Sequence, residues 1–231
     1  MMSEESLGQC LVDAMQQLAA RGLNRGTSGN GSCRLPDTPN RFLITPSGVP
    51  SGMLSSGSLV SMAIDGAEHN KSPAESNFIG RKNQIKPSSE WRFHHDILRD
   101  RPSVNAVIHV HSPFATSLAC LRKEIPPFHY MIAIAGGRTI RCAPYALFGT
   151  QELSNHVMVA LEGRHACLMA NHGMLAVGKT IGDALRITIE VESLCEQYWR
   201  ALQLGEPYLL SETQMRDVIE KFKTYGPNDS V

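Results

Sequence analysis

The chain has 231 residues, of which 42% are hydrophobic and 19% charged, and its formal net charge is zero. This length suits one core-forming domain, so we expect a single domain over residues 1–231. The balanced charge, without a cationic block, argues against nucleic acid or an anionic membrane as a partner. Apolar runs are too short for a membrane span, the acidic N-terminus lacks signal-peptide features, and the six cysteines form no C-x-x-C pair. We therefore expect a cytoplasmic protein with reduced thiols.

Hydrophobic periodicity, capping residues and turn residues predict alternating helices and strands. The predicted helices span residues 4–20, 90–99, 113–121, 151–161, 181–204 and 212–225. The predicted strands span residues 32–35, 42–45, 59–64, 105–111, 131–140, 167–169 and 174–177. Residues 67–86 are polar and unpatterned, which predicts a surface loop insertion, and 226–231 form a short tail.

Small residues gather at three predicted turns. Ser88 and Ser89 are favourable helix N-caps, and Glu90 in the first helical turn would suit the helix dipole. The turns Gly26–Gly31 and Thr45–Gly48 are rich in glycine and hydroxyl groups, so their backbone amides can face an anion. Such turns are equally typical of flexible connections, so the pattern alone leaves both interpretations open.

Two histidines share a face of the predicted strand 105–111. Successive strand side chains alternate between faces, so His109 and His111 point the same way, with Cα atoms roughly 6.6 Å apart. His172 lies in a turn between two short apolar runs. Three neutral ligands with one open position are typical of catalytic zinc, and Glu90 is then a candidate acid/base. Two histidines on one strand face are also compatible with simple core packing.

Five of the six other histidines have less distinctive surroundings. His94 and His95 follow Glu90 on the same predicted helix, which favours packing or a supporting role beside the metal ligands. His69 lies in the predicted loop, while His156 and His165 lie in or near a helix and suit exposed or locally bonded positions. None of these five calls for a chemical function.

Taken together, the motifs of this chain resemble the class II aldolase/adducin family, and within it the aldolases of L-fuculose 1-phosphate. The resemblance covers about residues 7–226 and depends on Ser88–His94, the 109/111 histidine pair, Pro127–Met131, Ala135–Gly137, Cys142–Tyr145, Phe148–Thr150, His172–Gly173 and Lys221–Gly226. It implies an α/β fold, a single-domain three-layer α/β/α sandwich with a mostly antiparallel central sheet. The loop 67–86 departs from the family pattern and leads into the motif at Ser88, which leaves the sugar open.

The resemblance also implies the chemistry of a zinc-dependent aldolase. A Zn²⁺ held by His109, His111 and His172 would stabilise the enediolate of dihydroxyacetone phosphate. Glu90 would move the proton at carbon and occupy the vacant metal position when substrate is absent. The implied phosphate-binding residues are Gly29, Asn30, Ser47, Gly48, Ser88 and Ser89.

Three aromatic residues are assigned to the aldehyde side by the same resemblance. Tyr130 would protonate the aldehyde-derived oxygen, while Phe148 and Tyr225 would close the pocket against water. The family is tetrameric, so we expect a homotetramer with active sites at subunit interfaces and a small sugar phosphate as substrate. For Tyr225, the alternative is a frayed tail with an exposed side chain.

Several other functions are found with the same fold, with or without the metal site. A pentulose-phosphate 4-epimerase or a sugar-acid phosphate decarboxylase would keep the metal site, and an adducin-like binding module would keep the fold without the chemistry. A Schiff-base aldolase would need a lysine such as Lys179, whose place after a strand predicts exposure instead. Within the aldolases, L-fuculose 1-phosphate and a 5-deoxy- or 5-methylthioribulose 1-phosphate remain open.

Overall fold

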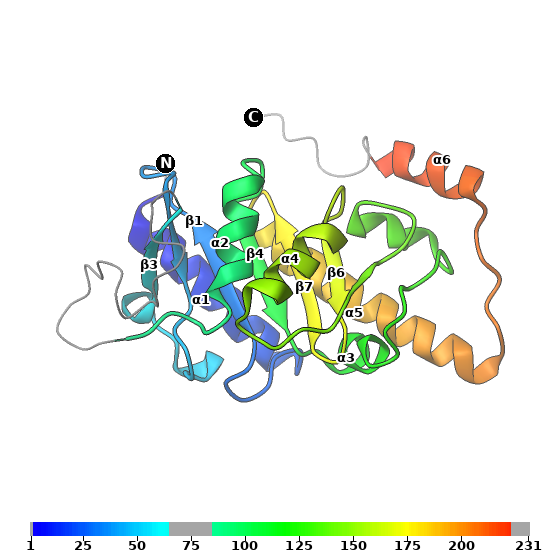
Figure 1. Cartoon of the computed structure of the whole chain (residues 1–231), viewed down its shortest axis with the longest axis horizontal. Coiled ribbons are helices and arrows are strands. Elements are labelled where there is room, and N and C mark those ends of the chain that lie inside the picture. Colours follow the sequence, from blue (N-terminus) through cyan, green and yellow to red (C-terminus); the bar gives the residue numbers. More distant parts are fainter. Residues whose placement is uncertain (1, 65–84, 223–231) are drawn as a thin grey trace.

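The computed structural model describes residues 2–64 and 85–222, which form one sheet between two layers of helices (Figure 1). The strands are β1 (Asn30–Arg34), β2 (Arg41–Ile44), β3 (Val60–Ala63), β4 (Ala106–Val110), β5 (Cys142–Ala143), β6 (Ala166–Met169) and β7 (Gly173–Gly178). The α-helices are α1 (Glu4–Ala20), α2 (Trp91–Asp100), α3 (Pro113–Ala119), α4 (Gln151–Ala160), α5 (Ile181–Leu204) and α6 (Glu212–Phe222). Short 3₁₀ helices are η1 (Ser51–Met53), η2 (Ser56–Ser58) and η3 (Tyr130–Ala135).

The seven strands lie in the order β3-β2-β1-β4-β7-β6-β5. Neighbouring strands are antiparallel except for β5 and β6, which are parallel. Helices α1, α3 and α5 cover one face of the sheet, while α2 and α4 cover the other (Figure 1). This arrangement confirms the predicted three-layer sandwich with a mostly antiparallel sheet.

Each face of the sheet has its own hydrophobic core, and the alternation of side chains along β4 explains why. Ala106, Ile108 and Val110 belong to the cluster under α1, α3 and α5, whereas Val107 belongs to the cluster under α2 and α4. His109 lies two residues after Val107 in the strand, so its side chain also faces α2. The alternation thus places the first predicted metal ligand beneath the helix that follows Glu90.

Side-chain caps define several helix starts. Thr150 Oγ1 accepts from the amide of Leu153 at the start of α4. Thr180 and Asp183 form a reciprocal capping box at the start of α5, and the Ser211–Gln214 box begins α6. These contacts satisfy amides that have no partner inside the helix.

Two predicted features are wrong. Residues 131–140 do not form a strand: η3 covers Tyr130–Ala135 and ends at Gly136, where φ is +85°. A short buried apolar run suits either structure, and its period does not separate them. At α2 the N-cap residue is Glu90 rather than Ser88 or Ser89. The Ser88 hydroxyl instead accepts from the Glu90 amide, at 3.3 Å.

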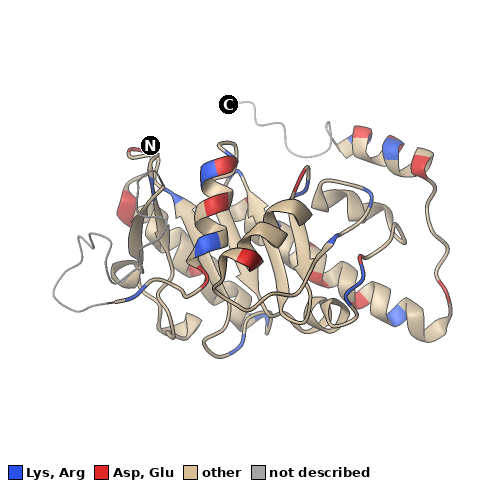
Figure 2. Cartoon of the chain, viewed as in Figure 1, with Lys and Arg blue, Asp and Glu red and all other residues tan. Residues whose placement is uncertain are grey.

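Some predictions fall on residues that the structure leaves undescribed. The predicted insertion 67–86 lies outside the described residues except for its last two positions, and the tail 226–231 lies outside them entirely. Within the described ranges, no helix combines the length and apolarity that crossing a bilayer requires. Figure 2 shows acidic and basic residues mixed on α2 and α6, as the zero net charge suggests.

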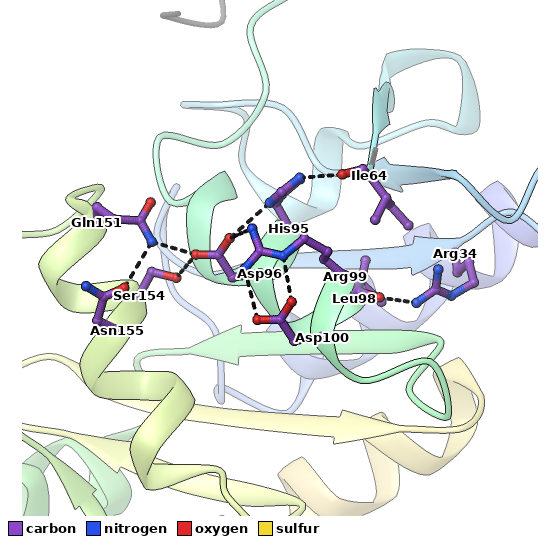
Figure 3. Close-up of polar contacts among 10 residues, drawn as sticks. All are labelled: Arg34, Ile64, His95, Asp96, Leu98, Arg99, Asp100, Gln151, Ser154 and Asn155. Atoms are coloured by element: carbon purple, nitrogen blue, oxygen red, sulfur yellow. Dashed lines mark hydrogen bonds and ion pairs between the residues drawn. The ribbon is translucent and has the colours of Figure 1, made fainter. Parts of the chain in front are cut away.

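A buried carboxylate fixes α2 against its neighbours (Figure 3). Asp96 Oδ2 accepts from Gln151 Nε2 and Ser154 Oγ of α4, both at 2.6 Å. Its Oδ1 lies 3.1 Å from His95 Nδ1, and His95 Nε2 lies 2.9 Å from the carbonyl of Ile64, just after β3. Burial raises the pKa of Asp96, but the hydrogen bonds from His95, Ser154 and Gln151 outweigh it and leave that pKa well below its usual range. This network joins α2 to α4 and to the sheet edge.

Candidate metal centre and pocket

Three imidazoles meet at one end of the central strands. His109 lies in β4, His111 follows that strand directly, and His172 lies in the turn between β6 and β7. Each pair of rings has a centroid distance of 4.8 Å and an interplanar angle between 70° and 74°. With Glu90, their ligand atoms all lie within 4.8 Å of one another. This near-threefold arrangement is what three nitrogen ligands around one ion require.

The tautomer of His109 follows from its partner. His109 Nδ1 lies 2.9 Å from the carbonyl oxygen of Met174, which can only accept, so Nδ1 carries the proton. In the neutral ring the lone pair on Nε2 then faces the cluster, 3.0 Å from His111 Nε2. Burial, together with His109, lowers the pKa of His111 to about 4, so that ring is neutral at pH 7. A cation between the rings suits these two nitrogens.

Glu90 closes the cluster from the start of α2. Its Oε2 lies 3.2 Å from His109 Nε2 and accepts from Asn30 Nδ2 at 2.9 Å. Its Oε1 lies 3.2 Å from His172 Nε2 but is buried without a hydrogen bond among the described residues. Burial raises the pKa of Glu90, but His109 and His172 outweigh that effect and hold it well below its usual range. An ionised carboxylate beside three imidazoles is a donor set that fits a divalent metal such as zinc.

Gly173 lets the turn with His172 approach β4. A Cβ at position 173 would lie 2.5 Å from the carbonyl oxygen of Val110 and 3.0 Å from His111 Cδ2. The preceding Asn171 adopts φ of +54°, which is uncommon for a residue other than glycine. The close approach of two backbones therefore defines where His172 lies.

A pocket of about 290 Å³ opens beside the cluster, lined in part by Glu90, His111 and His172. One side of it consists of small residues from three turns. These are Thr27, Ser28, Gly29, Asn30, Pro46, Ser47, Gly48, Ser88 and Ser89. The turns at 46 and 87 are joined by a β-bridge and by hydrogen bonds from Ser88 N to Thr45 O and from Ser47 N to Lys86 O, both 3.0 Å.

All six residues predicted to bind phosphate line this side of the pocket. Gly29 and Gly48 have φ of +78° and +73°, so the two turns depend on glycine. The side-chain amide of Asn30 donates to Glu90, and its part in phosphate binding stays a prediction. The structure brings the six residues together.

Another part of the pocket lining is more apolar. Tyr145, Ala146 and Phe148 line it, and the exposed fractions of the two aromatic residues are 52% and 62%. Arg92 donates to the carbonyl of Gly149 at 2.6 Å, which ties this loop to α2. Phe148 lines the pocket of its own chain, and its part on the aldehyde side stays a prediction. Tyr145 was not predicted as a site residue, although its aromatic side chain in the Cys142–Tyr145 motif was a usable signal.

Of the two predicted tyrosines, only Tyr130 belongs to the described residues, and it does not line this pocket. Tyr130 lies at the start of η3 with 51% of its surface exposed, and it is not among the pocket residues of its own chain. Tyr225 lies outside the described residues. Lys179, the candidate for a Schiff-base mechanism, is exposed and does not line the pocket either.

Comparison with known proteins supports the interpretation of this site. Residues 9–199 match the family model of the class II aldolase and adducin N-terminal domain. A 5-methylthioribulose-1-phosphate/5-deoxyribulose-1-phosphate aldolase of Rhodospirillum rubrum is 51% identical over 98% of this chain and 95% of its own. The L-fuculose phosphate aldolase of Escherichia coli K12 is 42% identical over 97% and 98%. A solved L-fuculose 1-phosphate aldolase superposes with a TM-score of 0.84 at 37% identity, over 96% and 98% of the two chains. The chain therefore belongs to the class II aldolase and adducin family.

Proposed function

We propose that this protein is a divalent-metal-dependent class II aldolase, with zinc as the metal. It cleaves a ketose 1-phosphate reversibly to dihydroxyacetone phosphate and a small aldehyde. The observation that carries the proposal is the cluster of Glu90, His109, His111 and His172 beside a pocket with one hydroxyl-rich and one aromatic side. An adducin-like binding module would have no need for a buried carboxylate among three imidazoles.

Different residues of this chain have different roles in the proposed cleavage reaction. A metal held by the three histidines would supply Lewis-acid stabilisation of the charge that develops on the three-carbon fragment. As the carbon–carbon bond breaks, the hydroxyl group on the departing fragment loses its proton and becomes the aldehyde carbonyl, while the electron pair stays on the three-carbon fragment. Glu90, which is ionised at rest, takes up a proton during this step and delivers it to the carbon of that fragment. In the reverse direction the Glu90 carboxylate removes this proton. Glu90 lies next to the cluster in a pocket wall, which suits this role.

The phosphate fits the side built from small residues. Hydroxyl groups of Ser47, Ser88 and Ser89 line that side, and glycine turns leave backbone close to the pocket. The start of α2 adds the positive end of a helix dipole. Phosphate bound at these turns leaves the aldehyde portion of the substrate for the apolar part of the lining.

The apolar part of the pocket lining favours a substrate whose aldehyde-forming end is apolar. Tyr145, Ala146 and Phe148 supply aromatic and methyl surface, and thioether sulfur makes favourable contacts with aromatic rings. The substrate that suits them is a 5-methylthio- or 5-deoxyribulose 1-phosphate, the type for which the Rhodospirillum relative is named. L-Fuculose 1-phosphate, for which the Escherichia relative is named, would place one more hydroxyl group against these apolar residues. We therefore expect it to be the poorer substrate.

The experiment is condensation of dihydroxyacetone phosphate with methylthioacetaldehyde, acetaldehyde and lactaldehyde, with product stereochemistry determined. We expect ketose 1-phosphates from all three, with kcat/KM highest for the first two. Failure to form any carbon–carbon bond with metal-loaded protein would contradict the aldolase proposal. A clear preference for lactaldehyde would contradict the proposed substrate alone. Interconversion of pentulose phosphates, or loss of carbon dioxide from a sugar acid phosphate, would identify a different reaction of the family.

We further propose a cytoplasmic homotetramer with active sites at subunit interfaces. All six cysteines are free, which suits a reducing compartment. Tyr130 is half-exposed and outside its own pocket, so its predicted proton transfer requires the pocket of another copy. Tyr225 is proposed to act across the same interface, with Phe148 beneath it.

Mixed oligomers test this sharing of sites. A subunit with Tyr130→Phe and one with Glu90→Gln should each be nearly inactive alone. Hybrids should recover activity at sites that combine an intact tyrosine with an intact Glu90. Hybrids as inactive as their parents, or a monomeric protein, would contradict the shared site.

A further inference from the structure

A run of buried hydrogen bonds leads from the sheet to Glu90. Ser32 Oγ lies 2.7 Å from His94 Nδ1, His94 Nε2 lies 2.6 Å from Asn30 Oδ1, and Asn30 Nδ2 lies 2.9 Å from Glu90 Oε2. The exposed fractions of the four side chains range from 0% to 6%. Ser32 and Asn30 belong to β1, and His94 lies one turn after Glu90 on α2. Water therefore does not compete for these contacts.

The donors and acceptors in this run have only one consistent order. An ionised Glu90 can only accept, so Asn30 must turn its amide nitrogen toward Glu90 and its oxygen toward His94. His94 must then donate from Nε2, which leaves Nδ1 to accept from the hydroxyl of Ser32. With the opposite tautomer, Asn30 would turn its oxygen toward Glu90, and two acceptors would face each other at 2.9 Å.

We propose that His94 is a positioning residue for the aldolase reaction. It holds the Asn30 amide in the one orientation that donates to Glu90, and so keeps that carboxylate directed at the metal ligands. The proposal rests on the proposed function because it takes Glu90 as the group that moves the proton. Burial, together with His109, lowers the pKa of His94 to about 3, which agrees with a neutral ring that both donates and accepts.

A simple packing role makes a different prediction. The His94 ring lies 4.8 Å from the ring of Phe93, in a stacked arrangement, and fills space under α2. Leucine at position 94 would fill much of that space but would neither donate to Asn30 nor accept from Ser32. Glutamine would keep an N–H donor near the position of Nε2. The comparison of these two substitutions separates positioning from packing.

The experiment compares His94→Leu and His94→Gln with His95→Gln, all in the metal-loaded full-length chain. His95 is a buried histidine on the same helix, and its ring nitrogens lie 3.1 Å from Asp96 Oδ1 and 2.9 Å from the Ile64 carbonyl oxygen. For His94→Leu we expect kcat to fall about 10–100-fold, as for other groups that orient site residues, with KM nearly unchanged. Deuterium exchange at the reacting carbon of dihydroxyacetone phosphate should slow in parallel. His94→Gln should recover most of both rates, and His95→Gln should lower Tm without lowering kcat.

Three outcomes would overturn the inference. The first is a His94→Leu protein with normal kcat and normal exchange. The second is a His94→Leu protein with a raised KM and an unchanged kcat. The third is an equal loss of rate in His94→Gln and His94→Leu, in proportion to the loss of stability, as a packing role requires.

A spectroscopic measurement decides the same point without any assay of activity. In ¹⁵N-histidine-labelled wild-type protein, His94 should show a protonated Nε2 and an unprotonated Nδ1 at neutral pH. The opposite tautomer, or a doubly protonated ring, would overturn the inference even if the protein proves to be an aldolase. If the protein shows the expected tautomer but has no aldolase activity, the hydrogen-bond order around His94 is supported and the proposed function is contradicted.

Discussion

Gly173→Ala tests whether the approach of β7 to β4 positions the metal ligands. The new methyl group would lie 2.5 Å from the Val110 carbonyl oxygen, 3.0 Å from His111 Cδ2 and 3.3 Å from His109 Cε1. Val110 pairs with Met174 inside the sheet, so the carbonyl has no room to retreat. Overpacking costs about 1–3 kcal/mol. Alanine regains about 0.5–1 kcal/mol because it loses less backbone entropy than glycine.

The net expectation is a destabilisation of about 1–2 kcal/mol, which corresponds to a decrease in Tm of about 2–8 °C for a chain of this size. Because the clash also moves two ligand rings, metal affinity should fall about 10–100-fold. Thermal unfolding and metal content after dialysis measure the two effects. Gly57→Ala is the matched control, since a Cβ there meets nothing within 4 Å. A Gly173→Ala protein as stable and as fully metal-loaded as the control would refute the reasoning.

Three further predictions test the chemistry and the scaffold. A chelator should abolish aldolase activity and zinc should restore it, as measured by aldehyde release; full activity in thoroughly metal-depleted protein would refute the metal centre. Glu90→Gln should lower the rate of proton exchange at dihydroxyacetone phosphate about 10²–10⁴-fold while the three histidines still bind metal, since the amide cannot accept the proton; near-normal exchange would mean that another residue is the base. Asp96→Asn should lower the free energy of unfolding at pH 7 by about 1.5–3 kcal/mol, because charged hydrogen bonds to α4 are lost. Since the folded pKa of Asp96 lies below its unfolded value of about 3.9, this contribution is complete above about pH 5 and declines as the pH falls. Urea unfolding of both proteins from pH 7 to pH 2 should therefore show the two curves converging at low pH.

The sequence predicted that His109, His111 and His172 come together, because their signal is local and periodic. His109 and His111 follow the two-residue period of a strand, and the turn before Gly173 shows in the residue types themselves. The caps of α4, α5 and α6 are likewise local, because each joins residues three apart in the chain. Patterns of this kind depend on a few neighbouring residues, so they can be recognised without knowledge of the fold.

Features set by distant contacts were missed or predicted wrongly. The apolar run before Gly136 forms η3 because α5 and α6 pack against it, which the run itself does not reveal. The two-residue strand β5 exists only through its pairing with β6. Glu90 occupies the N-cap, where the Ser88 hydroxyl accepts from its amide instead of capping the helix. Tyr145 reaches the pocket by a loop path that its sequence motif does not specify.

Strand register is what turns these separate residues into one site. Antiparallel pairing sets Asn30 of β1 opposite His109, and it sets Leu175 of β7 opposite the same histidine. That register brings the Asn30 amide to Glu90 on one side and the turn carrying His172 to the cluster on the other. Because strand side chains alternate, a shift of one residue in β4 would move His109 to the opposite face, under α1 and α5. The apolar residues that alternate with His109, in the core beneath α5, oppose that shift, so the packing of the far face helps to hold the metal ligands in place.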